Sequence, residues 1–344
     1  MPTETEDRNT NRAPQTGRAE QPRASSAEPP FDLAVALAEV ERLAKPPRMP
    51  PCNVRVRVKT SPWVRRALPT RLLVARAARQ AEAIWEHSEG EREGAIATME
   101  AIVSGTARAG EARELARLHL IERRVDTVLF WEQPWSASMD AVSAARVREA
   151  LSGERGVLLS ACHTGPFYRS MYSMPVGRAQ QYTIFGPWLF EPPSHDYWGR
   201  RVARWRKGAL GRKVPAEGSY QLLASLLARG DCVYVFYDMP GRRETRFLGK
   251  RALLADGSAR LAVESDALIL GLRSRREGHE VRVDAAEPLD PRELGGVEEV
   301  HAALGALHER WILERPQEMA DPNSFGWEHG AGPEAWVRPP RERA

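Results

Sequence analysis

The sequence lacks any long hydrophobic run and any recognisable leader segment. No stretch of about 18 consecutive apolar residues occurs in the chain, and a membrane-spanning helix needs at least that many. The N-terminal residues also lack the charged, then apolar, then small-residue pattern of a signal peptide. We therefore expect a cytoplasmic protein, with peripheral attachment to the cytoplasmic face of the cell membrane as the alternative.

Cysteine and lysine are both scarce. The three cysteines are Cys52, Cys162 and Cys232, an odd number without the spacing of a metal site, which favours a reducing compartment. Lysine supplies five of the 50 basic residues, and the formal net charge is +4. Such a charge permits anionic partners but does not require nucleic acid. We expect no metal, no bound cofactor and no nucleic acid.

The N-terminal part has little that folds by itself. Residues 1 to about 30 are rich in Thr, Glu, Arg, Pro and Ser, and such a composition buries too little apolar surface to become ordered. Leucine and valine then recur at helical spacing over 31–43, which predicts a short amphipathic helix, and a proline-rich linker follows. These boundaries predict a tail over 1–52, one domain over 53–335 and a second tail over 336–344.

The domain begins with a segment of mixed pattern. Val54, Val56 and Val58 alternate with basic residues. This period of two predicts a strand, which is either an edge strand protected by charge or a basic binding strip. Beyond it, helical spacing predicts four helices, and an apolar run predicts another strand before the last of them. The helices cover 62–86, 92–109, 111–122 and 141–151, and the strand covers 125–131.

The stretch from Gly156 to Arg169 is the most informative. The apolar run 157–162 ends abruptly at His163 and is followed by turn residues, which predicts a buried strand ending in a histidine. Open α/β sheets build their sites at that end of a strand. The alternative is a histidine held by a neighbouring carbonyl group. Cys162 precedes His163 and should point to the opposite face as a buried thiol.

A second buried strand runs from Asp231 to Asp238. A helix over 218–229 precedes it, and Gly230 is placed as the C-cap residue of that helix. Alternating helices and strands predict an α/β fold with a mostly parallel central sheet flanked by helices. His163 and Asp238 would then lie at the same edge, although Asp238 is also placed to cap the next turn. Further predicted elements are strands in 181–190, 268–272 and 280–288 and a helix over 261–267.

The residues around His163 also resemble a known family. Gly156, Val157, His163, Gly165 and Phe167 match the site strand and H-x4-D/E motif of the lysophospholipid acyltransferase superfamily. The sequence is most similar to its lipid A biosynthesis (lauroyl/myristoyl) branch. The resemblance extends in order over roughly residues 80 to 330. It includes Arg204 or Arg206 followed by Gly211 and a short strand, Arg246 to Gly249, Glu280 to Pro288, and Leu307 to Pro316 with Trp327 and His329 downstream.

The resemblance implies a reaction and a set of roles. A fatty acyl group would pass from an acyl carrier protein or acyl-coenzyme A thioester to a hydroxyl or amine of a lipid or specialised metabolite. His163 would be the general base, and Tyr168 or Asp238 would orient it. The substrate-binding residues would be Gly165, Arg204, Arg206 and Gly211.

One position departs from the family pattern. Tyr168 stands where the motif has an acidic residue, and a phenol with a pKa of about 10 supplies no carboxylate at neutral pH. Three interpretations follow. Another acid replaces it, with Asp238 before Glu191 and Asp196; or the acceptor is a stronger nucleophile such as an amine; or the site is inactive and the protein only binds an acyl chain or carrier.

The segment 182–205 combines aromatic and basic residues. Such a surface suits a membrane interface, an acidic carrier protein or single-stranded nucleic acid, and it is also typical of a helix with one packed and one solvated face. Contact with the carrier or the inner membrane surface is favoured here. A nucleic-acid-associated protein that uses the basic segment 200–213 stays as the remaining alternative.

Overall fold

The computed structural model describes residues 31–44, 51–59, 61–132, 137–172, 180–186, 190, 211–278 and 280–319. The predictions made for residues 1–30 and 336–344, for Glu191, Asp196, Arg204 and Arg206, and for Trp327 and His329 lie outside these residues. The short helix predicted over 31–43 lies inside them and is confirmed as Leu33–Ala44. None of the described helices is long and apolar enough to span a bilayer.

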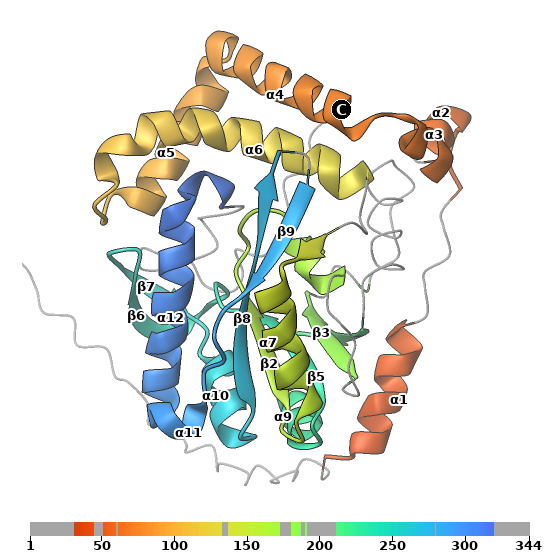
Figure 1. Ribbon diagram of the computed structural model, residues 1–344, viewed down its shortest axis with the longest axis vertical. Coiled ribbons are helices and arrows are strands. Elements are labelled where there is room, and N and C mark those ends of the chain that lie inside the picture. Colours follow the sequence, from red (N-terminus) through yellow and green to blue (C-terminus); the bar gives the residue numbers. More distant parts are fainter. Residues whose placement is uncertain are drawn as a thin grey trace, which may run out of the picture. The chain divides into compact units, whose positions relative to one another are not determined.

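The centre of the fold is a seven-stranded sheet in the order β1-β9-β8-β2-β5-β3-β4 (Figure 1). The pair β8–β9 is antiparallel and the other neighbours are parallel, so the predicted α/β fold with a mostly parallel sheet is confirmed. A separate antiparallel pair comprises β6 (Pro240–Phe247) and β7 (Lys250–Leu254). The sheet strands are β1 (Ser138–Met139), β2 (Val157–Ala161), β3 (Gln181–Phe185), β4 (Arg212–Pro215), β5 (Cys232–Phe236), β8 (Leu268–Glu277) and β9 (Glu280–Ala285).

Helices cover both faces of this sheet. α7 packs with the odd-numbered residues of β2 on one face, whereas α9, α10 and α12 pack with Leu158 and the other apolar residues of the opposite face. The helices are α1 (Leu33–Ala44), α2 (Val54–Lys59), α3 (Pro62–Ala67), α4 (Thr70–His87), α5 (Glu89–Val103), α6 (Ala112–Glu132), α7 (Ala141–Ser152), α9 (Tyr220–Ala228), α10 (Gly257–Glu264), α11 (Pro291–Leu294) and α12 (Val297–Glu314), with short 3-10 turns η1 (Ala109–Glu111), η2 (Phe167–Tyr172) and η4 (Pro316–Glu318).

The two central strands end level with each other. Every residue of β2 is buried, as expected for a strand covered on both faces. Ala161, its last residue, pairs with Phe236, the last residue of β5. His163 and Asp238 each follow two residues later, and the parallel register therefore brings them to the same edge of the sheet.

Two predicted strands are helices in the structure. The segment 125–131 is the C-terminal part of α6, where Val125 and Leu129, four residues apart, are both buried on one helix face. The segment 54–59 is α2, and the Asn53 side chain accepts a hydrogen bond from the N–H of Val56 at 2.8 Å. The helix predicted over 62–86 is interrupted before Pro69, because a proline disfavours helical backbone in the residue before it.

Candidate active site

His163 and Asp238 form a tightly held pair. The Asp238 side chain is fully buried, and its Oδ1 lies 2.9 Å from His163 Nδ1. Its Oδ2 accepts a hydrogen bond from the backbone N–H of His163 at 2.7 Å. A carboxylate only accepts hydrogen bonds, so the ring donates from Nδ1 and its lone pair is on Nε2. The carboxylate thus fixes both the tautomer and the direction of an imidazole whose side chain is 16% exposed.

Aromatic rings enclose the imidazole. The ring of Phe236 stacks on it with centroids 4.0 Å apart, and the ring of Phe167 meets it edge-on at 4.9 Å. Phe236 belongs to β5 and Phe167 begins η2, so the end of one strand and the turn after the other supply these walls. Because the Asp238 carboxylate is fully buried, the low local dielectric strengthens its hydrogen bond to His163.

Tyr168, the residue at the acidic position of the motif, makes a different contact. Its side chain is buried, and its hydroxyl donates to the carbonyl oxygen of Asp126 in α6 at 3.4 Å. Burial raises the pKa of this hydroxyl well above its ordinary value, so it stays protonated. The neighbouring Arg169 is buried as well and donates to the carbonyl oxygen of Leu129 at 2.8 Å. These two residues attach η2 to α6.

Gly165 shapes the turn after His163. Its backbone has a φ of 55°, and a Cβ atom there would lie 2.6 Å from the carbonyl oxygen of Ser274. Its N–H donates to the carbonyl oxygen of Glu318 at 2.7 Å, and Thr164 forms an antiparallel bridge with Met319. The sequence analysis assigns Gly165 to substrate binding; in this conformation its N–H is already engaged by the segment that follows α12.

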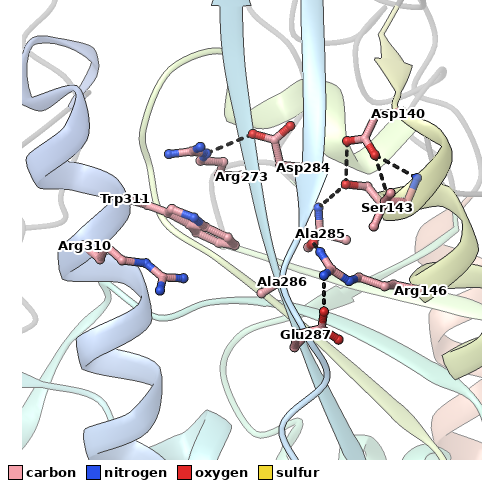
Figure 2. A pocket seen from close by; sticks show the side chains of 11 residues that line it. Asp140, Ser143, Arg146, Arg273, Asp284, Ala285, Ala286, Glu287, Arg310 and Trp311 are labelled. Carbon is pink, nitrogen blue, oxygen red and sulfur yellow. Dashed lines mark hydrogen bonds and ion pairs between the residues drawn. The ribbon is translucent and has the colours of Figure 1, made fainter.

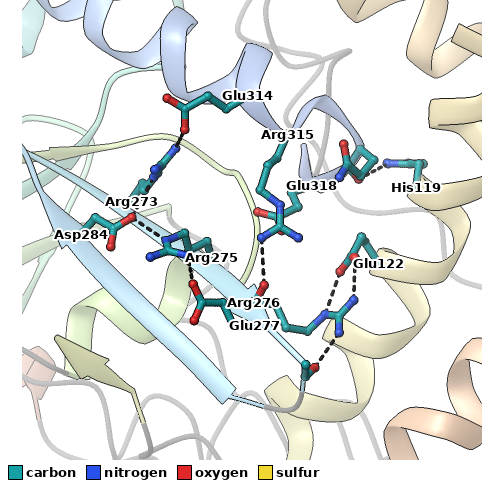
Figure 3. A network of polar contacts seen from close by, with 12 residues as sticks. His119, Glu122, Arg273, Arg275, Arg276, Glu277, Asp284, Glu314, Arg315 and Glu318 are labelled. Atoms are coloured by element: carbon teal, nitrogen blue, oxygen red, sulfur yellow. Dashed lines mark hydrogen bonds and ion pairs between the residues drawn. The ribbon is translucent and has the colours of Figure 1, made fainter. Parts of the chain in front are cut away.

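Glu318, whose side chain lies next to Gly165, belongs to a network of charged groups (Figure 3). Arg276 of β8 forms two hydrogen bonds with Glu122 of α6, at 2.8 Å and 2.5 Å. Arg315 pairs with Glu318 at 2.9 Å and also donates to the carbonyl oxygen of Arg276. Burial raises the pKa of Glu318 to about 7. Burial also raises the pKa of Asp126 well above its ordinary value.

Two histidines of α12 lie on the opposite face of the sheet. His308 Nε2 is 2.9 Å from the hydroxyl of Ser160 in β2, and burial lowers the pKa of His308 to about 4. His301 Nε2 is 3.4 Å from the hydroxyl of Tyr237. Sequence analysis missed these residues, although their spacing of seven with Leu304 between them is the spacing of a buried helix face. The sequence around Glu318 has no comparable pattern that marks this residue as part of the site.

Gly211 and Cys162 are also singled out by the sequence, and the structure gives each of them a role in packing. Gly211 has a φ of 80°, and a Cβ atom there would lie 2.6 Å from the carbonyl oxygen of Gln181, so β4 approaches β3 closely at this point. Cys162 is buried, and burial raises the pKa of its thiol well above the ordinary value. The prediction that Cys162 is a buried thiol is therefore confirmed.

A pocket of about 340 Å³ lies elsewhere, between α7 and α12 at the end of β9 (Figure 2). Its arginines mostly have acidic partners: Arg146 pairs with Glu287, and Arg273 pairs with Asp284. Neither His163 nor Asp238 lines this pocket, so we do not assign the chemistry of the pair to it.

Comparison with solved structures gives a slight structural likeness. No family model matches this chain, and no curated protein matches it. Among solved structures, it is similar to the 1-acyl-sn-glycerophosphate (LPA) acyltransferase PlsC from Thermotoga maritima. The sequence identity is 17% and the TM-score 0.36, and the match covers 73% of this chain and 98% of that chain. Likeness of this extent does not indicate which reaction the protein catalyses.

Proposed function

We propose that this protein is an acyltransferase in which His163 is the general base and Asp238 orients it. The observation that carries the proposal is the contact of 2.9 Å between His163 Nδ1 and a fully buried Asp238 carboxylate. Together with the residues around His163 that match the H-x4-D/E motif apart from its acid, it supports a base aimed at a substrate rather than a histidine held only for packing. A fatty acyl thioester of a carrier protein or coenzyme A is the proposed donor, as the resemblance to the lipid A acyltransferases implies.

The chemistry follows from the two ring nitrogens. Nε2 of His163 removes the proton of an acceptor hydroxyl or amine as its oxygen or nitrogen attacks the thioester carbonyl carbon. Negative charge develops on the carbonyl oxygen, and the Asp238 carboxylate stabilises the imidazolium formed at the same time. When the intermediate collapses, the C–S bond breaks and the thiolate takes the proton from Nε2. The products are an ester or amide and a free thiol.

The acid missing from the motif is central to this proposal. Tyr168 is neutral and bonds to α6, whereas Asp238 reaches the imidazole from the neighbouring strand. A carboxylate can orient the imidazole from the motif position of Tyr168 or from Asp238 just beyond the end of β5, because its distance and direction at Nδ1 decide its effect. This favours a working enzyme over the alternative of an inactive acyl-binding or carrier-binding protein.

The test is release of free thiol from acyl thioesters. Purified protein is incubated with acyl carrier and acyl-coenzyme A thioesters of several chain lengths, with a cell extract as the source of acceptor. We expect release that depends on the acyl chain and falls about 10²- to 10⁴-fold in His163→Ala. Cys162→Ala, altered at the adjacent buried residue, is the matched control and should keep the activity.

Two results would count against the proposal. Thiol release that survives His163→Ala would remove His163 from the reaction. Absence of release with every donor and extract, combined with tight binding of the acylated carrier, would instead favour the inactive binding protein.

A further inference from the structure

The segment from Val54 to Leu72 exposes an unusual amount of apolar surface. It includes α2, α3 and the start of α4 (Figure 1). Of the ten exposed large apolar side chains in the described part of the chain, six lie in this segment. Trp63 is 78% exposed, the most of the ten. The other five are Val54, Val58, Val64, Leu68 and Leu72.

The same segment is strongly basic. Residues 53–81 contain eight Arg and Lys and no Asp or Glu, and the first acid after them is Glu82. The whole chain has 50 basic and 46 acidic residues, so without these eight it has 42 bases and 46 acids. The net charge of +8 on this short region therefore exceeds the +4 of the whole chain, and the region also has the exposed tryptophan.

We propose that this segment, the 54–72 surface, docks on an anionic lipid bilayer. Apolar side chains enter the boundary between headgroups and acyl chains, and arginine side chains meet the lipid phosphates. Tryptophan in particular is suited to that boundary. An acidic protein or a nucleic acid would be recognised mainly through the arginines and would not need Val54, Trp63 and Leu72 to be exposed together.

The position of the 54–72 surface relates it to the candidate active site. Both α3 and α4 contact α6. The C-terminal half of α6 carries the carbonyl groups of Asp126 and Leu129, which hold Tyr168 and Arg169 in the turn after His163. The helix α6 therefore connects a bilayer bound at the 54–72 surface with that turn. This proposal does not depend on acyl transfer, because lipid binding is measured without donor or acceptor.

The test is flotation of the full-length protein with large unilamellar vesicles. Vesicles of phosphatidylcholine alone are compared with vesicles in which about one third of the lipid is phosphatidylglycerol, at low and high salt. We expect binding to the anionic vesicles that weakens with salt. Replacing two arginines, in Arg55→Gln with Arg71→Gln, should lower the partition coefficient about 25-fold, since each charge contributes about fivefold. Trp63→Ala with Leu72→Ala should lower it about tenfold or more.

Control variants carry substitutions of the same two kinds elsewhere on the surface. Leu118→Ala with Val142→Ala removes exposed apolar side chains, and Arg148→Gln with Arg310→Gln removes exposed charges. Both double variants should bind vesicles within about twofold of the parent protein. Circular dichroism verifies that every variant is folded.

Three outcomes would overturn the proposal. One is absence of binding to the anionic vesicles, and another is equal loss of binding in the test and control variants. The third is tight, salt-sensitive binding of a single-stranded oligonucleotide or an acidic carrier protein that needs the arginines but not Trp63, with no vesicle binding.

Discussion

The turn after β2 and the 54–72 surface differ in how firmly they are held. The turn is fixed from several directions: Asp238 holds His163, α6 holds Tyr168, and the segment after α12 holds Gly165. The 54–72 surface instead presents its largest side chain, Trp63, to solvent. Residues in the first region should therefore affect activity or stability strongly. Substitutions in the 54–72 surface should instead weaken binding to a partner and leave the stability of the fold unchanged.

The largest expected effect is that of Asp238→Asn on acyl transfer. The asparagine amide donates a hydrogen bond toward His163 Nδ1 and leaves the proton on Nε2, where it blocks the base. We expect kcat/KM to fall by as much as ~10⁴-fold, as for carboxylate-to-amide changes in comparable triads. The thiol-release assay measures it. Tyr168→Phe, which removes a hydroxyl directed at α6, should change the rate far less, and a comparable loss in both variants would contradict the assignment.

Gly165→Ala should give the next largest effect, on stability. The alanine would adopt a φ of 55° with its Cβ 2.6 Å from a backbone oxygen that cannot move easily. We expect the free energy of unfolding to fall by about 2 to 4 kcal/mol, measured by urea denaturation.

Gly218→Ala is the matched control for this glycine. Gly218 has a φ of 69° but no atom within 4 Å of its Cβ position, so only the backbone strain of about 1 kcal/mol applies. Equal losses in the two variants would mean that the contact with Ser274 has no energetic role.

The pair of strands that frame the site could be predicted from the sequence. The runs 157–162 and 232–237 are almost entirely apolar and are followed by turn residues, and parallel strands with such runs end at the same edge. That Asp238 rather than Glu191 or Asp196 contacts His163 follows only from the register of β2 on β5.

Other features depend on contacts that the sequence does not show. Val125 and Leu129 fit a strand or a helix equally well, and burial against Val281 and Ala77 shows that they belong to a helix face. The alternation of Val54, Val56 and Val58 predicts a strand, but a strand needs a neighbour to pair with, and this segment is the helix α2. Glu318 comes to lie behind Gly165 only because α12 ends there.

A smaller effect should appear as a pH dependence of stability. Burial raises the pKa of Glu318 from 4.5 to about 7. Between these values the folded protein retains a proton that the unfolded chain has released, so the free energy of unfolding falls as pH rises. The stabilisation is complete below pH 4.5 and is lost as pH passes about 7.

Glu318→Gln separates this contribution from the others. The variant stays neutral, so from about pH 5 to about pH 8 the parent protein should lose on the order of 2 kcal/mol more than Glu318→Gln in urea denaturation. Glu149→Gln, at an exposed position of α7, is the control and should follow the parent curve. Parallel curves for all three proteins would refute the prediction.

The smallest expected effect on stability is that of Trp63→Ala. This variant tests most directly whether the 54–72 surface differs from the turn after β2. Removing a tryptophan from a core costs about 3 to 5 kcal/mol, but the Trp63 side chain is 78% exposed. We expect the free energy of unfolding to change by less than about 0.5 kcal/mol, as measured by urea denaturation. A loss of several kcal/mol would show that Trp63 packs against the body of the protein in solution. An unchanged stability together with lost vesicle binding would mean that this side chain serves a partner, because an exposed tryptophan that stabilises neither the fold nor a complex has no energetic reason to be there.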